Sequence, residues 1–179
     1  TEILSDPALN GLGRYHISEL VTGLEPGRTY HYQVKGLHGG AAFALGGDVT
    51  FTTLSRLQVW RRFHFEITEN TGLAANDADP DGDGMPNLLE FAFGLDPWQN
   101  SSGELPQATF TPNEISFNFS EPDTFMGIAY IAEWSTTLEP DSWLPMTEHA
   151  VLPGEHLFKL NTTGLPRVFV RLRVAEISP

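Results

Sequence analysis

Residues 76–97 of this chain read NDADPDGDGMPNLLEFAFGLDP. The first half places Asp77, Asp79, Asp81 and Asp83 on alternate positions, where their carboxylates repel one another unless a cation lies between them. The second half has apolar residues at helical spacing, a proline near the start and a glycine at the end, which predicts a helix over residues 87–94. The stretch is therefore either a cation site or a disordered acidic linker.

The spacing of the oxygen-bearing residues is that of an EF-hand calcium loop. Counted from Asp79, they fall on positions 1, 3, 5, 7, 9 and 12, and Gly84 stands at position 6, where the bend is sharp. Calcium takes six to eight oxygens at roughly 2.3–2.6 Å, so several short carboxylates must converge from one tight turn. The predicted ligands are Asp79, Asp81, Asp83, the main-chain carbonyl of Met85, Asn87 and Glu90.

This loop is expected to be single and structural. No second loop of this spacing occurs, and Pro86 has no N–H to offer a paired loop. The helix before it is expected to end near Phe65, well before the first ligand. Magnesium fits less well because it keeps its waters, and Asp77 is either a further ligand or a helix cap. A solvated acidic turn remains the alternative to calcium.

Composition narrows the classes of partner. The chain has 10 basic and 23 acidic residues, a formal net charge of −13 and no cysteine. Nucleic acids and anionic membranes attract clustered Lys and Arg, so neither is an expected partner. No apolar run approaches the ~18 residues of a membrane span, so membrane insertion is not expected either. The absence of cysteine excludes disulfides, zinc thiolate sites and cysteine nucleophiles.

Three zones follow one another, at residues 1–54, 55–97 and 98–179. The outer zones alternate in the manner of β-strands, and the middle zone changes to helical spacing. We predict a mainly β fold, with two small β-sandwich-like units joined by a short helical segment that carries the EF-hand-like calcium loop. Expected strands lie at 14–21, 29–37, 47–54, 114–121, 127–135, 156–162 and 167–174, and a glycine-rich turn at 38–47.

Two side-chain patterns predict which faces are buried. Ser55 is expected to cap a helix whose apolar stripe comprises Leu57, Trp60 and Phe63, with Val59 as a further candidate. The last strand, RVFVRLRV at 167–174, is expected to bury its even-numbered residues and to expose its odd-numbered ones.

The first zone resembles the C-terminal half of a fibronectin type III domain. The resemblance rests on LVTGLEPGRTYHYQVKGL at residues 20–37 and on the closing FTTL, and it covers residues 14–54. It implies a tyrosine corner, in which the hydroxyl of Tyr30 returns to upstream backbone. The family's opening strands have no counterpart in the sequence before Tyr15.

The middle zone is similar to a junction segment of large secreted or surface proteins of environmental bacteria. Its D-x-D-x-D-G core also resembles thrombospondin type 3 and dockerin loops, although a dockerin normally has two such loops. In those bacterial proteins the junction precedes a C-terminal β-domain that ends in F-x-R-L-x-V, which VFVRLRV matches. The resemblance implies an extracellular or cell-surface location in a bacterium.

We do not expect an enzyme, because the six histidines are scattered and no G-x-S-x-G turn occurs. The expected function is that of a non-catalytic structural or adhesion module, in which calcium rigidifies the junction between the β-rich units. Two alternatives remain. A carbohydrate-binding accessory module of a secreted hydrolase would bind polysaccharide through aromatic residues such as Trp98 or Trp143. A dockerin-like module would present the helix at 88–95 to another surface protein.

Overall fold

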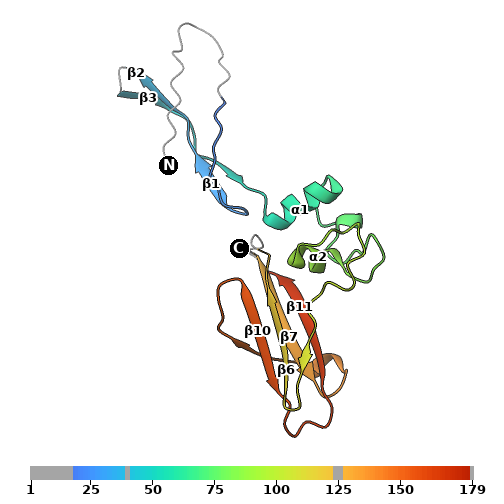
Figure 1. Cartoon of the computed structure of the whole chain (residues 1–179). Helices are drawn as coiled ribbons and strands as arrows, with labels where there is room; N and C mark the ends of the chain where they lie inside the picture. The colour runs from blue at the N-terminus through green and yellow to red at the C-terminus, as the bar shows by residue number, and fades with distance from the viewer. Residues whose placement is uncertain (1–17, 39–40, 123–126, 178–179) are drawn as a thin grey trace. The chain divides into compact units, whose positions relative to one another are not determined.

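The computed structural model describes residues 18–38, 41–122 and 127–177 (Figure 1). Over these residues the chain is mainly β, with small antiparallel sheets and two α-helices, as the sequence predicted. The chain divides into two compact units, Thr1–Thr53 and Leu54–Pro179, which are described separately. No helix in the described ranges has the length and apolar composition needed to cross a bilayer.

The described part of the first unit contains two two-stranded sheets. Strand β1 (Thr29–Tyr32) pairs with β4 (Val49–Thr52), and β2 (Lys35–His38) pairs with β3 (Ala41–Leu45). The strand expected at 47–54 is thus confirmed as β4, whereas the one expected at 29–37 is divided into β1 and β2, which belong to different sheets. The glycine-rich turn expected at 38–47 is wrong in part, because Ala41–Leu45 pairs with β2, and cross-strand pairing outweighs the composition of a short segment.

The strand expected at 14–21 is not found in the described part of that range. Residues 14–17 lie outside the described residues, and residues 18–21 form no strand. The predicted contact between the Tyr30 hydroxyl and upstream backbone is present, since the Glu25 N–H donates to this hydroxyl at 2.7 Å. The Tyr30 ring also stacks on Phe51 across the β1–β4 ladder, with ring centroids 5.8 Å apart.

The second unit begins with helix α1 (Arg56–Phe65). Ser55 caps it as predicted, and Gln58 completes a capping box by accepting from the Ser55 N–H. The apolar stripe was predicted only in part: Leu57 is buried and Trp60 packs against the core, but Val59 and Phe63 are 53% and 82% exposed. Arg61 is buried instead, because its guanidinium donates to backbone carbonyls of the following loop.

Two antiparallel sheets form the β part of this unit. The first has the order β5, β6, β10 and β9, with bounds Thr109–Phe110, Glu114–Ser120, Glu155–Asn161 and Thr147–His149. The second has the order β11, β7 and β8, with bounds Phe169–Glu176, Ile128–Ser135 and Leu144–Pro145. The four strands expected here are confirmed as β6, β7, β10 and β11. The short strands β5, β8 and β9 carry too few residues to show a period of two in the sequence.

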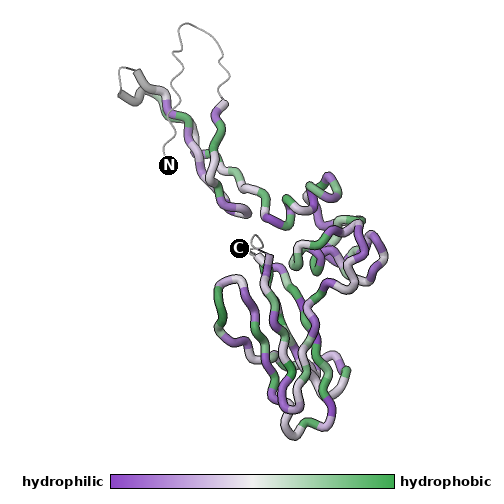
Figure 2. The backbone as a smooth tube through the Cα atoms, in the orientation of Figure 1, coloured by the Kyte–Doolittle hydropathy of each residue, from purple (hydrophilic) through white to green (hydrophobic). Residues whose placement is uncertain are grey.

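Buried residues from both sheets and both helices make one hydrophobic cluster. Its members are Leu57, Phe91, Ala92, Phe117, Ile128, Tyr130, Ala132, Met146, Phe158 and Leu160. The expected alternation in β11 is confirmed in part: the even-numbered residues 168–174 are half-buried and pack against this cluster, but Phe169 and Arg171 on the other face are half-buried as well. Figure 2 shows the same alternation of hydrophilic and hydrophobic positions along the strands. Arg171 and Arg173 instead pair with Glu133 on the neighbouring strand β7.

Helix α2 (Asn87–Phe93) lies where the sequence placed it, between Pro86 and Gly94. Gly94 ends it in the left-handed region at φ 68°, a conformation that glycine adopts without strain. The Tyr130 hydroxyl donates to the Ala92 carbonyl at 2.5 Å, and the Phe93 ring contacts the Tyr130 ring edge-on. Strand β7 therefore holds the C-terminal end of α2. Burial, and then the charge of Glu121, raise the pKa of Tyr130 to about 12.

Replacing Tyr130 by phenylalanine tests this contact. We expect Tyr130→Phe to lower the free energy of unfolding by about 1–2 kcal/mol, because the buried Ala92 carbonyl loses its partner at nearly constant side-chain volume. Urea unfolding measures the change. Tyr32→Phe, at a half-exposed tyrosine, is the matched control and should be neutral. Equal stability of Tyr130→Phe and wild type would contradict this account.

Candidate metal centre

The acidic loop is folded by its own aspartates. The Asp79 carboxylate accepts three backbone N–H groups, from Gly82 at 2.9 Å, Asp83 at 3.2 Å and Gly84 at 2.9 Å. Gly82 and Gly84 have φ of 76° and 92°, conformations that glycine tolerates and other residues rarely adopt. The D-P-D-G-D-G sequence thus wraps the backbone around the first aspartate of the loop.

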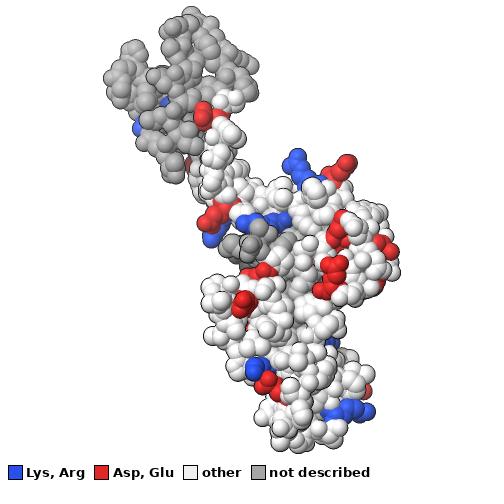
Figure 3. Space-filling model, in the orientation of Figure 1, with Lys and Arg blue, Asp and Glu red and all other residues white. Residues whose placement is uncertain are grey.

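The two later aspartates continue this pattern. Asp81 Oδ1 accepts the Asp83 N–H at 3.1 Å, and Asp83 Oδ1 accepts the Met85 N–H at 2.7 Å. One carboxylate oxygen from each of Asp79, Asp81 and Asp83 lies within 4.8 Å of the others. Figure 3 shows Asp and Glu side chains gathered over this part of the surface. Three negative charges are therefore held together by local backbone geometry.

Backbone hydrogen bonds close the loop at its base. The Asn87 N–H donates to the Ala78 carbonyl at 2.8 Å, and the Leu88 N–H donates to the Asn76 carbonyl at 3.0 Å. These N–H groups lie in the first turn of α2, where a helix has no carbonyl of its own to offer them. The residues before the loop thus position the start of the helix that follows it.

Asn87, the residue at position 9, is 1% exposed. Its amide nitrogen donates to the carbonyls of Leu73 and Ala75, at 2.7 Å each. Because only the NH₂ group can donate, these two bonds decide the orientation of the amide, and Oδ1 must point the other way. Asn87 Oδ1 is buried and accepts no hydrogen bond.

Glu90 is the residue on which the interpretation of the site depends. It is 0% exposed, and neither carboxylate oxygen has a hydrogen-bond partner. In the described residues six buried side-chain N or O atoms lack a partner, and four of them belong to Asp81, Asn87 and Glu90. Buried polar atoms are normally satisfied, so such a concentration in one place points to a missing partner.

Electrostatics at Glu90 agree with its burial. Desolvation, and then the charges of Asp81, Asp83, Asp79 and Asp96 in that order, together raise the pKa of Glu90 from 4.5 to about 7. The compact group of carboxylate oxygens includes the three aspartates and does not include Glu90. Glu90 therefore lies close enough to feel the three charges, while its carboxylate is not among the oxygens within 4.8 Å.

Met85 is the remaining predicted ligand, and Asp77 is the acidic residue just before the loop. Met85 buries its side chain, which is 3% exposed, so only its main chain is available to the loop. Asp77 is exposed and lies outside the compact group of carboxylates. It is not the cap of α2 either, since Pro86 occupies that position without a side-chain hydrogen bond.

Two contacts that organise the site were not predicted. The Ser101 N–H donates to Asp83 Oδ2 at 2.6 Å, which links the acidic loop to the chain beyond α2. Arg61 Nη2 donates to Asn76 Oδ1 at 2.5 Å, and its Nε donates to the Ala74 carbonyl at 3.1 Å. Each of these bonds joins residues more than ten positions apart in the sequence. Neither Ser101 nor Arg61 belongs to a recognisable sequence motif.

The pH dependence of stability tests the burial of Glu90. In metal-free folded protein the Glu90 carboxyl keeps its proton up to a pH of about 7, whereas in the unfolded chain it releases this proton near pH 4.5. Metal-free stability should therefore fall by about 3 kcal/mol as the pH rises through this range. With saturating calcium we expect that fall to disappear, because the bound ion keeps the folded carboxylate ionised as well. Urea unfolding across the range measures both series.

Glu90→Gln is the matched variant for this experiment. The difference between wild type and Glu90→Gln isolates the carboxyl from the histidines, including His64, whose pKa is lowered by burial. At a pH above 7 in chelator, the glutamine variant should be more stable than wild type. A metal-free wild type that gains stability with rising pH, relative to this variant, would refute the assigned environment of Glu90.

Arg61 is expected to act as a positioning residue. It is 5% exposed, and burial lowers its pKa although Glu176 opposes the shift. Arg61→Lys should cost about 2 kcal/mol of stability, because a lysine cannot reproduce the fork of bonds to Ala74 and Asn76. Thermal melting measures the loss. Arg62→Lys, at the exposed neighbour, should change nothing, and equal effects of the two substitutions would contradict this role.

No protein-family model, curated protein sequence or solved structure significantly matches this chain. The interpretation of the acidic loop therefore rests on the chemistry and geometry of its own residues.

Proposed function

We propose that this chain is a non-catalytic calcium-binding structural module of an extracellular bacterial protein. The observation that carries the proposal is the burial of Glu90, with both carboxylate oxygens unpartnered, beside Asp79, Asp81 and Asp83. A hard dication would supply the missing partner for Asp81 Oδ2 and for both Glu90 oxygens, and its charge would offset those of all four carboxylates. The oxygens of Asn87 and Met85 complete the proposed ligand set.

Two features favour calcium over a plain acidic turn and over magnesium. A solvated turn would leave its glutamate in water, whereas Glu90 has no exposed surface. Burying an unpaired carboxylate near three others is costly, and a cation removes that cost. Calcium accepts six to eight protein oxygens, whereas magnesium keeps several waters and uses one or two carboxylates. The donor set is all oxygen and contains no nitrogen or sulfur ligand, which suits a hard cation.

The proposed role of the ion is to rigidify the junction. Asp83 of the loop accepts a hydrogen bond from Ser101 beyond α2, and Asn76 at the base of the loop accepts one from Arg61 of α1. An ion at the centre would therefore stabilise segments on both sides of the loop. Because the folded state binds it and the unfolded state does not, stability would depend on its concentration. Extracellular sites of this type commonly have a Kd of about 10⁻⁴–10⁻³ M.

The finer description of the fold belongs to the same proposal. The first unit would be a fibronectin type III-like half domain, supported by the Glu25–Tyr30 hydrogen bond. The second would contain a small β-sandwich, supported by the single core cluster that residues of both sheets share. The thrombospondin- or dockerin-like loop and the F-x-R-L-x-V ending support placement in a secreted or surface protein of a bacterium.

The two alternative functions have weaker support. A sugar platform needs flat, exposed aromatic rings, but the Trp98 ring is tilted by 51° to that of Phe65, and Arg171 lies over Trp143. A docking helix needs an exposed apolar face, but Phe93 of α2 packs on Phe119 and Tyr130. These contacts favour a structural role for the aromatic residues.

Melting the protein with calcium and with chelator tests the proposal. Millimolar calcium should raise the melting temperature of wild type by several degrees, since a ligand at about ten times its Kd contributes about 1.4 kcal/mol. Asp81→Asn and Glu90→Gln should lose most of this rise. Isothermal titration with calcium measures the affinity of the same variants.

Asp77→Asn is the matched control, because it removes an exposed carboxylate from the same segment outside the compact group. It should keep the full response to calcium. A wild-type melting temperature that is the same in calcium and in chelator would end the proposal. An equal loss in Asp77→Asn and Asp81→Asn would show that general acidity, and not this ligand set, attracts the ion.

A further inference from the structure

Strand β11 is an unusual edge of its sheet. In the described part of the second unit, the other edge strands β5, β8 and β9 have two, two and three residues, whereas β11 has eight. Strand β7 pairs with one side of β11, and no described strand pairs with the other side. Short edges are a common defence against unwanted pairing, so a long free edge among short ones is distinctive.

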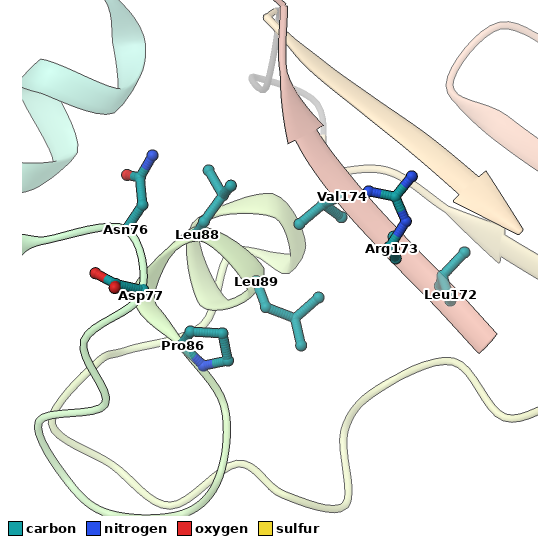
Figure 4. A pocket seen from close by; sticks show the side chains of 8 residues that line it. All are labelled: Asn76, Asp77, Pro86, Leu88, Leu89, Leu172, Arg173 and Val174. Atoms are coloured by element: carbon teal, nitrogen blue, oxygen red, sulfur yellow. The ribbon is translucent and has the colours of Figure 1, made fainter. Parts of the chain in front are cut away.

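An apolar groove of about 430 Å³ runs between α2 and this strand. Its walls are Leu88 and Leu89 from α2, the consecutive residues Leu172, Arg173 and Val174 from β11, and Asn76, Asp77 and Pro86 from the acidic-loop segment. Successive residues of a strand point to opposite faces, so a groove that touches three in a row follows the edge of the strand. Figure 4 shows Leu89 and Val174 extending into this gap between helix and strand.

The charges on β11 indicate what kind of strand would fit. Arg171 and Arg173 share one face of the strand, with side chains 40% and 47% exposed. Glu133 accepts one hydrogen bond from Arg171 and two from Arg173, which leaves further N–H donors on both guanidiniums. The opposite face carries Leu172 and Val174. A complementary strand has acidic residues opposite the arginines and apolar residues opposite the aliphatic face.

A second copy of this chain is a poor occupant of the edge. Antiparallel pairing of two β11 strands about a two-fold axis at Leu172 would set Arg171 of one copy against Arg173 of the other. Like charges directly opposite one another destabilise a strand pair. A partner with alternating acidic and apolar residues avoids this repulsion.

We propose that the free edge of β11 and the groove beside α2 bind an extended peptide segment of a protein partner, in which acidic and apolar residues alternate. Backbone hydrogen bonds to β11 supply binding that does not depend on sequence. Leu88, Leu89 and Val174 receive the apolar side chains. Arg173, which borders the groove, selects acidic residues on the other face. The groove borders the acidic-loop segment through Asp77 and Pro86, so its test is made with calcium present.

Peptide binding to the intact, isotopically labelled chain in saturating calcium tests this proposal. The probes are two capped octapeptides, one of alternating Val and Glu and one of alternating Val and Lys. The Val–Glu peptide should slow hydrogen exchange at alternate amides of Phe169–Glu176 by about tenfold or more, because outward N–H groups gain partners. The Val–Lys peptide should leave these amides unchanged.

Two variants identify the contacts. Arg173→Glu should weaken binding of the Val–Glu peptide by about tenfold and allow the Val–Lys peptide to bind. Leu89→Ser, in the wall of the groove, should weaken binding without changing the charge preference. Arg62→Glu, at an exposed arginine of α1, is the control and should bind like wild type.

Three outcomes would overturn the proposal. The first is that neither peptide perturbs residues 169–176 at millimolar concentration, while spectra of the remaining residues show an intact fold. The second is equal binding of the two peptides, which would remove the role of the arginines. The third is protection of the β11 amides by raising protein concentration alone, which would make a second copy the occupant.

Discussion

A carboxylate buried without a hydrogen-bond partner is the constraint on which the rest of this structure depends. Glu90 loses its hydration on folding and lies near three further negative charges. Such a group must bind a proton or a cation, because the interior offers no other compensation. The same residue belongs to helix α2, whose next two residues enter the hydrophobic core. The electrostatics of the loop and the packing of the core are therefore coupled through one helical turn.

A second glutamate, Glu133, is half-buried and shows the opposite arrangement. Glu133 on β7 has a side chain that is 13% exposed, and hydrogen bonds from Arg173 and then Arg171 hold its pKa below the ordinary value against the effect of burial. The negative charge of Glu133 is thus compensated by the protein itself, through two arginines on the adjacent strand. Glu90 has no such compensation among its described neighbours. Comparing the two residues separates an ion pair within the protein from a buried carboxyl that needs a proton or a cation.

Helix α2 is too short to be stable alone, since isolated helices need roughly 12–15 residues. It is held at both ends by contacts from outside it. The Ala78 and Asn76 carbonyls accept its first N–H groups, and Tyr130 donates to the Ala92 carbonyl at its end. This arrangement places Glu90 and Asn87 toward the loop, Phe91 and Ala92 in the core, and Leu89 on the groove beside β11. One seven-residue helix thus contributes side chains to the acidic loop, to the hydrophobic core and to the groove beside β11.

The sequence alone determined the mainly β class, the bounds of both helices within one or two residues, and the four long strands of the second unit. These features follow from periodicity, caps and turn residues, which are local. It also placed the three aspartates together, because their contacts span fewer than six positions. Tertiary structure alone decided that Arg61 is buried and Phe63 exposed, that Ser101 contacts Asp83, and that Glu90 lies out of water. Each of these depends on which distant segment covers a side chain, and a residue's sequence neighbours do not contain that information.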